Sequence, residues 1–165
     1  MNVTAMDVLG CLFNPAETVC FRVFEDRKDG VFHGAKLECE CGKYMGIEET
    51  LKKHNAQNRG IFFVVNYGGH DDEAITRINA QFFEMDDGTF EEQQAKIDAF
   101  PLPPSMVIKT RKSLHVYYFM DGSARVGRFR TIRQQLVKRF EGDPVCVNES
   151  RVMRLPGFHH CKKEP

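Results

Sequence analysis

The chain has 165 residues, 42% of them hydrophobic, and its 23 Lys and Arg residues are balanced by 23 Asp and Glu residues. This length buries one sizeable core rather than two independent ones, so we expect a single domain with two lobes. No apolar run approaches the roughly 20 residues that cross a bilayer, and the opening residues lack the basic and apolar regions of an export signal. We therefore expect a cytoplasmic protein without a membrane partner.

The neutral total hides an uneven distribution of charge along the chain. Residues 1–104 carry 10 Lys and Arg against 18 Asp and Glu, whereas residues 105–165 carry 13 against 5. An acidic half beside a basic half suits an enzyme that handles polyanions with metal-binding carboxylates. Ordinary solvated surface charge explains the same distribution, so this pattern alone assigns no function.

The first part of the chain, residues 1–79, predicts an N-terminal α/β lobe. Apolar periodicity predicts helices over residues 5–13 and 47–54 and strands over residues 18–25, 31–40 and 61–65. This lobe is less regular than the part of the chain that follows it.

The second part, residues 80–165, predicts a lobe of definite topology. The expected elements are strands over residues 80–86, 106–109, 114–120 and 144–147 and helices over residues 89–100 and 126–140. Thr89 and Glu92 predict a capping box at the start of the first helix. The order of elements is the split-βαβ arrangement of ferredoxin-like and RNA-recognition-motif-like (RRM-like) domains. We therefore predict an α+β fold in which an RRM-like sheet follows the N-terminal α/β lobe.

Three acidic residues in the second lobe form a candidate metal site. Glu84 and Asp86 are two residues apart on an expected strand, so both carboxylates project from one face and can share divalent cations. Asp143 precedes the last expected strand, which lies beside the first strand in split-βαβ topology, and His115 lies on the neighbouring third strand. We expect the three carboxylates and the imidazole to converge on one sheet face.

A polar and basic stretch at the third expected strand forms a candidate phosphate site. Ser113 and His115 share a strand face, and both side chains can donate hydrogen bonds to a triphosphate. Arg111 and Lys112 precede them and can neutralise its charge. Arg154, in the sequence Arg-Val-Met-Arg, is a further residue that can clamp phosphate. Taken singly, each of these residues also fits an ordinary polar strand end.

The cysteines offer a second possible metal site, which we do not expect to form. Cys39 and Cys41, with Cys11, Cys20 and His33, have the chemistry of zinc ligands. Cys-x-Cys is not the usual Cys-x2-4-Cys knuckle, however, and no second knuckle follows. We expect free thiols and no zinc.

The expected helix over residues 126–140 is strongly basic. Its cations include Arg128, Arg130, Arg133 and Lys138. They form either a solvated face or a surface for a template strand, and the solvated face is the favoured interpretation.

Four short sequences together resemble motifs of the archaeo-eukaryotic primase superfamily. They are FFEMDD at 82–87, TRKSLHVYYFM at 110–120, GDP at 142–144 and RVMRLPGFHHCK at 151–162. The resemblance covers residues 66–163 and is greatest to the primase-polymerase domains of bacterial phages, plasmids and integrated elements, which are often fused to a helicase.

This resemblance implies roles for the residues that match the family's motifs. Glu84 and Asp86 match its first motif and Asp143 its third, which together hold the catalytic metals. Ser113 and His115 match its second motif, which binds the phosphates of the incoming nucleotide. The implied function is a DNA primase-polymerase that uses two Mg²⁺ or Mn²⁺ ions to add nucleoside triphosphates along a single-stranded DNA template. The resemblance also implies a helicase domain or partner, and we expect this chain to be part of a longer replication protein.

Two other functional classes use a similar sheet. A non-catalytic RNA-binding module would stack bases on aromatic residues, but Tyr117, Tyr118 and Phe119 do not match the RNA-recognition signature and the acids would repel RNA. A replication initiator that nicks DNA needs a His-hydrophobic-His metal pair, and His159 and His160 lack the spacer.

Overall fold

The structure, a computed structural model, describes residues 3–27, 30–142 and 147–161. The chain forms two compact units: Met1–Ile75 together with Ser150–Pro165, and Thr76–Glu149. The second unit is therefore inserted in the sequence of the first. In the described part of the chain, no helix is long and apolar enough to cross a bilayer.

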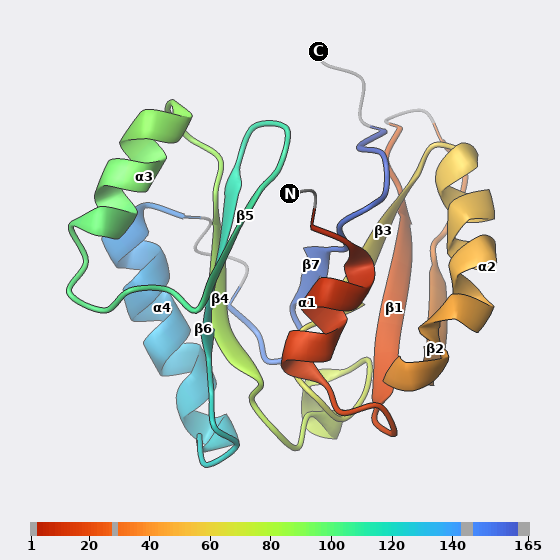
Figure 1. Ribbon diagram of the computed structural model, residues 1–165, viewed down its shortest axis with the longest axis horizontal. Helices are drawn as coiled ribbons and strands as arrows, with labels where there is room; N and C mark the ends of the chain where they lie inside the picture. The colour runs from red at the N-terminus through yellow and green to blue at the C-terminus, as the bar shows by residue number, and fades with distance from the viewer. Residues whose placement is uncertain (1–2, 28–29, 143–146, 162–165) are drawn as a thin grey trace. The chain divides into compact units, whose positions relative to one another are not determined.

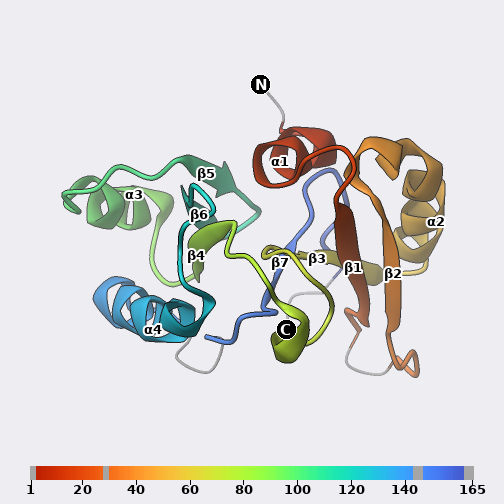
Figure 2. The same cartoon turned by 90° about the horizontal axis from the view of Figure 1, so that it is seen from below.

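The first unit is built on an antiparallel sheet with the strand order β2-β1-β3-β7. Its elements are α1 (Ala5–Leu12), β1 (Thr18–Glu25), β2 (Ala35–Glu40), the 3-10 helix η1 (Cys41–Lys43), α2 (Tyr44–Ala56), β3 (Arg59–Val64), the 3-10 helix η2 (Asp72–Ala74) and β7 (Val152–Arg154). Figure 2 shows α1 and α2 on the same side of this sheet.

Side-chain alternation buries one face of the first sheet. Val19 and Phe21 of β1 and Ile61 and Phe63 of β3 are fully buried. The ring of Phe21 lies 6.1 Å from the ring of Tyr44 on α2. The apolar face of the sheet therefore packs against the helices, as the two-residue period of a half-buried strand requires.

The second unit has an antiparallel sheet with the strand order β4-β6-β5. Its elements are β4 (Ala80–Met85), α3 (Phe90–Asp98), β5 (Met106–Lys109), β6 (Leu114–Phe119), the 3-10 helix η3 (Val126–Arg128) and α4 (Phe129–Phe140). Helices α3 and α4 lie on one face of this sheet (Figures 1 and 2).

The core of the second unit lies between its sheet and its helices. Its buried members are Phe83, Met85, Ile97, Leu114, Val116, Tyr118, Val137 and Phe140. The rings of Phe83 and Phe140 are 4.3 Å apart and stacked. Because side chains alternate along a strand, Glu84, His115 and Tyr117 project from the opposite face of the sheet.

The predicted α+β class is confirmed, and every helix and strand expected between residues 80 and 140 forms. The capping box at the start of α3 is also present. The Thr89 hydroxyl accepts a hydrogen bond of 3.2 Å from the Glu92 N–H, and the Glu92 carboxylate accepts one of 2.7 Å from the Thr89 N–H.

Several boundaries differ from the predicted ones; the helix expected over 47–54, for example, runs from Tyr44 to Ala56. The strand expected over 31–40 begins only at Ala35, because Gly34 has a φ of +96°, outside the extended region. The strand expected over 144–147 falls mainly on residues outside those described. The predicted lobes, 1–79 and 80–165, also differ from the two units, because β7 pairs with β3 and so joins the segment from Ser150 onward to the first unit.

Candidate active site

The predicted metal ligand Glu84 lies where two neighbouring strands meet. The register of β4 and β6 places Glu84 opposite His115. The Glu84 Oε1 atom lies 3.8 Å from Nε2 of His115, and it accepts a hydrogen bond of 3.3 Å from the Ser113 hydroxyl. The sheet thus brings together a residue of the acidic motif and both residues of the Ser-x-His motif.

A tight turn fixes Ser113 before β6 begins. The Thr110 hydroxyl donates to the Ser113 carbonyl at 2.9 Å and accepts from the Ser113 N–H at 3.0 Å. The two side-chain hydroxyls are 2.7 Å apart. Ser113 and His115 are each 3% exposed, so the surrounding protein limits the freedom of both side chains.

Asp86 follows the end of β4 and is much more exposed than Ser113 and His115. Its carboxylate lies 3.5 Å from Nζ of Lys112, with 48% of the Asp86 side chain and 65% of the Lys112 side chain exposed. An exposed ion pair of this kind contributes little to stability. The Glu84 side chain is 49% exposed, so a cation from solvent can reach both acids.

Two buried polar atoms on this sheet face have no hydrogen-bond partner in the described structure. They are Nδ1 of His115 and the hydroxyl of Tyr117. Burial raises the pKa of Tyr117, the nearby charge of Glu84 raises it further, and Arg133 opposes the rise. An unpaired buried polar atom costs about 1–3 kcal/mol, so a ligand or a water molecule is the expected partner of such an atom.

The chemistry of this face suits a hard divalent cation. Mg²⁺ prefers oxygen ligands and is commonly held by one or two carboxylates together with substrate phosphates. Glu84 and Asp86 supply two carboxylates. Within residues 3–27, 30–142 and 147–161, no group of three or more His, Cys, Asp or Glu side chains is arranged to hold a metal ion. The third predicted ligand, Asp143, lies outside the described residues.

Gly142, the last described residue before Asp143, lies against β4. A Cβ atom at Gly142 would be 3.3 Å from the carbonyl oxygen of Glu84. The Gly142 N–H donates a hydrogen bond of 2.9 Å to the carbonyl of Val137 at the end of α4. The chain therefore passes beside Glu84 directly before it reaches Asp143.

The two predicted phosphate-binding arginines have different surroundings. Arg111 is exposed in the turn before β6. Arg154 belongs to β7 in the first unit, where Nη1 and Nη2 each donate a hydrogen bond of 3.2 Å to the Asp26 carboxylate. The Asp26 side chain is only 2% exposed, and the Arg154 guanidinium lies 4.5 Å from the Phe62 ring centre. A phosphate would have to compete with a buried carboxylate for Arg154, so local geometry supports this role least.

Helix α4 is not a uniformly solvated basic face. Arg133 is 3% exposed, and its guanidinium lies 4.1 Å from the ring centre of Phe82 and donates to the Phe82 carbonyl. The favoured interpretation of a solvated face is therefore wrong for Arg133. The sequence does carry a signal, because Arg133 is four residues from both Phe129 and Val137 and so lies on the apolar stripe of the helix.

The described cysteines are free, as expected. Cys20 and Cys41 are buried, Cys39 is partly buried and Cys11 is exposed. Burial raises the pKa of Cys20 to about 11, and the neighbouring charge of Glu38 adds to this rise. Near neutral pH, Cys20 is therefore held in its thiol form.

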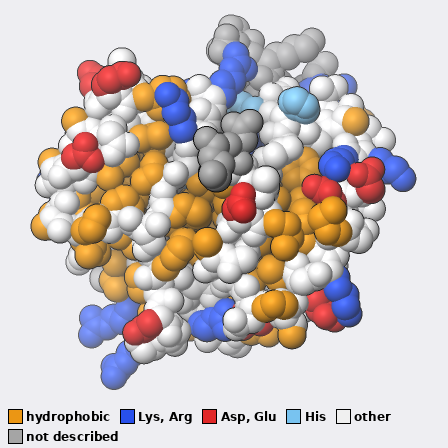
Figure 3. All heavy atoms as spheres, viewed as in Figure 1, with side chains coloured by type: hydrophobic (Ala, Val, Ile, Leu, Met, Phe, Trp, Pro, Cys, Tyr) orange, Lys and Arg blue, Asp and Glu red, His pale blue; other side chains and the backbone are white. Residues whose placement is uncertain are grey.

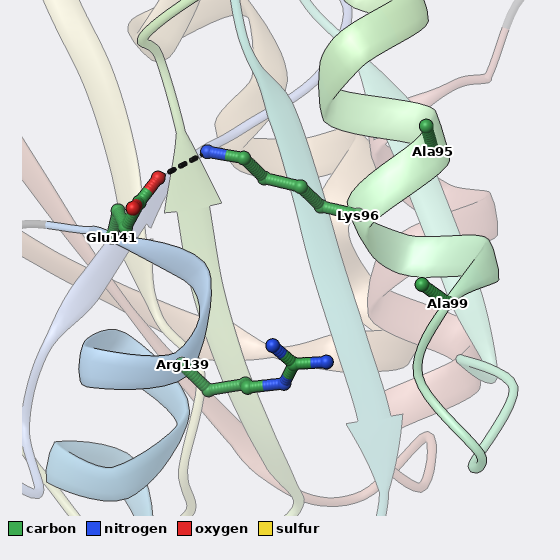
Figure 4. A pocket seen from close by; sticks show the side chains of 5 residues that line it. All are labelled: Ala95, Lys96, Ala99, Arg139 and Glu141. Carbon is green, nitrogen blue, oxygen red and sulfur yellow. Dashed lines mark hydrogen bonds and ion pairs between the residues drawn. The ribbon is translucent and has the colours of Figure 1, made fainter.

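A surface pocket of the second unit is lined by residues other than these. Its lining consists of Ala95, Lys96, Ala99, Arg139 and Glu141 (Figure 4). Lys96 and Glu141 form an ion pair there. None of the residues predicted from the sequence lines this pocket, so it is not the site that the motifs describe.

Sequence reasoning missed a buried polar residue next to both motifs. Gln93 of α3 is 1% exposed, and its side-chain amide approaches backbone oxygens of Asp87 and Lys112. The available signal is its place three residues after Phe90 and four before Ile97, on the buried stripe of the helix.

Comparisons with known proteins identify this arrangement. Residues 72–165, more than half of the chain, match the family described as the RepB DNA-primase N-terminal domain. The AEP domain of the cyanophage S-2L primase-polymerase (PrimPol) has a similar solved structure, with a TM-score of 0.79. It is 29% identical in sequence, and the match covers 93% of this chain and 80% of that chain.

Two solved structures of the primase RepB′ share the fold at lower identity. One has a TM-score of 0.71 and 18% identity, and the match covers 98% of this chain and 52% of that chain. The other, the catalytic domain of RepB′ in complex with initiator DNA, has a TM-score of 0.67 and 16% identity, with 97% and 80% covered. A comparison with curated proteins gave no match. The chain therefore belongs to the RepB DNA-primase N-terminal domain family and is an archaeo-eukaryotic primase-like domain of the phage and plasmid type.

Proposed function

We propose that the domain is a DNA primase-polymerase, a nucleotidyltransferase that adds nucleotides to a 3′-hydroxyl along a single-stranded DNA template. The observation that carries the proposal is the meeting of Glu84 with Ser113 at 3.3 Å and with His115 at 3.8 Å. A carboxylate, a hydroxyl and an imidazole from two family motifs thus share one sheet face. The similarity to the phage primase-polymerase domain supports the polymerase part of the proposal.

The acids are proposed as the metal ligands. Glu84, Asp86 and Asp143 would hold two Mg²⁺ or Mn²⁺ ions, whose chemistry is to lower the pKa of the attacking hydroxyl and to stabilise charge on the attacking and leaving oxygens. Glu84 and Asp86 are half exposed, which suits ligands of a cation that also keeps water or substrate oxygens. The position of Gly142 against the Glu84 carbonyl supports Asp143 as the third acid.

The Ser-x-His motif and its basic neighbours are proposed to hold the triphosphate of the incoming nucleotide. Ser113 and His115 can donate hydrogen bonds to phosphate oxygens, and Nδ1 of His115 has no partner in the described structure. Arg111 and Lys112 would stabilise the negative charge that develops on the leaving group. In the reaction the 3′-hydroxyl loses its proton to solvent and its oxygen bonds to the α-phosphorus, the bond from this phosphorus to the oxygen that bridges it to the β-phosphorus breaks, and pyrophosphate leaves.

Single-stranded DNA is the proposed template, with a helicase domain or partner working beside this domain. The structure of RepB′ with initiator DNA supports a DNA partner. The chain has no net charge, and on the face drawn in Figure 3 Lys and Arg side chains lie in several places, with Asp and Glu side chains beside some of them. Because nucleic-acid affinity comes largely from phosphate contacts, we propose that the isolated domain binds its template weakly.

The test is incorporation of a labelled nucleotide on a plain single-stranded DNA template, with and without Mg²⁺ or Mn²⁺. Products that extend by several nucleotides and require the metal are expected. Binding of nucleic acid without any incorporation would favour a non-catalytic module, and cleavage of the template would favour a nickase. Either result would overturn the proposed activity.

A further inference from the structure

We propose that Gln93 is a positioning residue, which fixes the distance between the acidic motif and the Ser-x-His motif and thereby sets the affinity of the site for divalent cations. This inference rests on the function proposed above. Gln93 belongs to α3 and lies outside every motif that suggested the function. A glutamine with 1% exposure must satisfy its amide inside the protein, and its partners reveal what it holds.

On one side, Gln93 holds the loop that carries Asp86. Its Nε2 atom lies 3.3 Å from the carbonyl oxygen of Asp87 and 3.5 Å from that of Gly88. Both carbonyls come directly after Asp86, so the amide fixes the backbone that presents this carboxylate.

On the other side, Gln93 holds the backbone on either side of Ser113. The same Nε2 atom lies 3.4 Å from the carbonyl oxygen of Lys112, and Oε1 accepts a hydrogen bond of 3.0 Å from the Leu114 N–H. The orientation of the amide follows from these contacts. The reverse orientation would place Oε1 against carbonyl oxygens and the amino group against an N–H donor.

This position matters because the strand pairing stops there. The register of β4 and β6 ends at the pair Met85 and Leu114. Asp86 and Ser113 both lie just beyond this last pair of the register. The Gln93 side chain spans the gap and takes the place of the missing strand pairing.

The loop held by Gln93 is also restricted on its helix side. Gly88 has a φ of +78°, and a Cβ atom there would be 2.7 Å from the Glu92 Oε2 atom. The capping box between Thr89 and Glu92 fixes the residues that follow. The start of α3 therefore fixes one end of the loop, and Gln93 sets the distance between this loop and Ser113.

Only an amide satisfies all of these contacts. Glutamate keeps the acceptor for the Leu114 N–H but turns a second oxygen towards three carbonyl oxygens, whereas methionine fills the volume without any hydrogen bond. In either case Asp86 should move relative to Ser113. Residues that orient metal ligands from outside the coordination shell typically affect metal affinity or activity by about 10- to 100-fold.

The experiment compares Gln93→Glu and Gln93→Met with the unaltered protein. Calorimetric titration with Mn²⁺ measures metal affinity directly, and nucleotide incorporation at varied Mn²⁺ measures kcat and the nucleotide KM. We expect Mn²⁺ to bind about tenfold more weakly and kcat to fall by about 10- to 100-fold, with a smaller change in KM. The matched control is Gln94→Met, because the Gln94 amide is exposed and bonds Asp98 on the same helix at 2.8 Å. We expect this control to behave like the unaltered protein.

Each outcome decides between the inference and the function on which it rests. A folded Gln93→Glu protein with unaltered Mn²⁺ affinity and kcat would overturn the inference and leave the proposed function standing, even where Gln93→Met fails to fold. If the unaltered protein neither binds Mn²⁺ nor incorporates nucleotide, the proposed function fails and the inference fails with it.

Discussion

Two pairs of charged residues, one in each unit, show how similar side chains can serve structure or reactivity. In the first unit, Asp26 and Arg154 are joined by two hydrogen bonds of 3.2 Å, and the Asp26 side chain is 2% exposed. In the second unit, Asp86 and Lys112 approach to 3.5 Å with about half or more of each side chain exposed. The buried pair has little capacity for a ligand, whereas the exposed acid can exchange its partner for a cation at low cost. Burial and the completeness of pairing, rather than residue type, distinguish the two sites.

The largest expected effect is on the three proposed metal ligands. Glu84→Ala, Asp86→Ala and Asp143→Ala should each reduce nucleotide incorporation by about 1,000-fold or more, because each removes a ligand of the ions that stabilise charge in the reaction. The temperature of thermal unfolding should be unchanged or slightly higher, because removing one of several neighbouring negative charges relieves their repulsion. The matched control is Asp87→Ala, which should retain activity. Full activity in Asp86→Ala would show that these acids are not the metal ligands.

Substitutions in the buried pair Asp26 and Arg154 should lower stability rather than activity. Asp26→Ala and Arg154→Ala should each lower the free energy of unfolding by about 3–5 kcal/mol, because each leaves one charge buried and unpaired. Urea denaturation measures this change, and the double variant should recover part of the loss. If Arg154→Ala instead keeps its stability and loses affinity for a nucleoside triphosphate, then Arg154 binds phosphate. The Asp26–Arg154 pair would then not be a purely structural pair.

A smaller effect is expected at His115. Like the Asp26–Arg154 pair it is buried, but its Nδ1 atom has no hydrogen-bond partner in the described structure and so can accept a ligand. His115→Ala should weaken binding of a nucleoside triphosphate with Mg²⁺ by about tenfold, corresponding to roughly one hydrogen bond to a charged group. Isothermal titration measures the affinity, with the exposed His33→Ala as control. Unchanged affinity in His115→Ala would place the triphosphate elsewhere.

The smallest expected effect concerns Glu92, an exposed acid whose carboxylate is already used by the capping box of α3. Hydrogen bonds from Thr89 hold the pKa of Glu92 below its ordinary value of 4.5. Because the folded value is lowered, the stabilisation is fully present above pH 4.5 and is lost as the pH falls through the lowered value. An NMR titration of the Glu92 carboxyl should show this depressed pKa, and Thr89→Ala should shift it upward. A Glu92 pKa at or above 4.5 in the unaltered protein would mean that the cap does not form in solution.

Much of the second unit could be predicted because its signals are local. The capping box at Thr89, the alternation along β4 and the apolar stripe of α4 each depend on residues close together in sequence. The meeting of Glu84 with His115 also follows from topology, since a split-βαβ order makes the first and third strands neighbours.

What the sequence did not reveal depends on contacts between distant residues. β7 has only three residues, too few to show a period, and nothing in Val152–Arg154 indicates that its partner is β3. Arginine and glutamine usually face solvent, so residue type alone predicts that Arg133 and Gln93 are exposed. Their spacing along the helix predicts burial instead, and both are buried. Their partners are mostly backbone carbonyls, and because every residue has one, the sequence does not indicate which carbonyl will be the partner.

The return of β7 to the first sheet also affects how the protein can fold during synthesis. β3 is made early, but the strand that covers its outer edge leaves the ribosome only after the whole inserted unit has been made. Until then β3 has unpaired backbone groups along an edge rich in isoleucine and phenylalanine, the kind of edge on which chains aggregate. The first unit must therefore wait for its last strand, whereas the inserted unit has all of its described strands close together in sequence. Translation speed through Thr76–Glu149 would thus determine how long the incomplete sheet remains exposed.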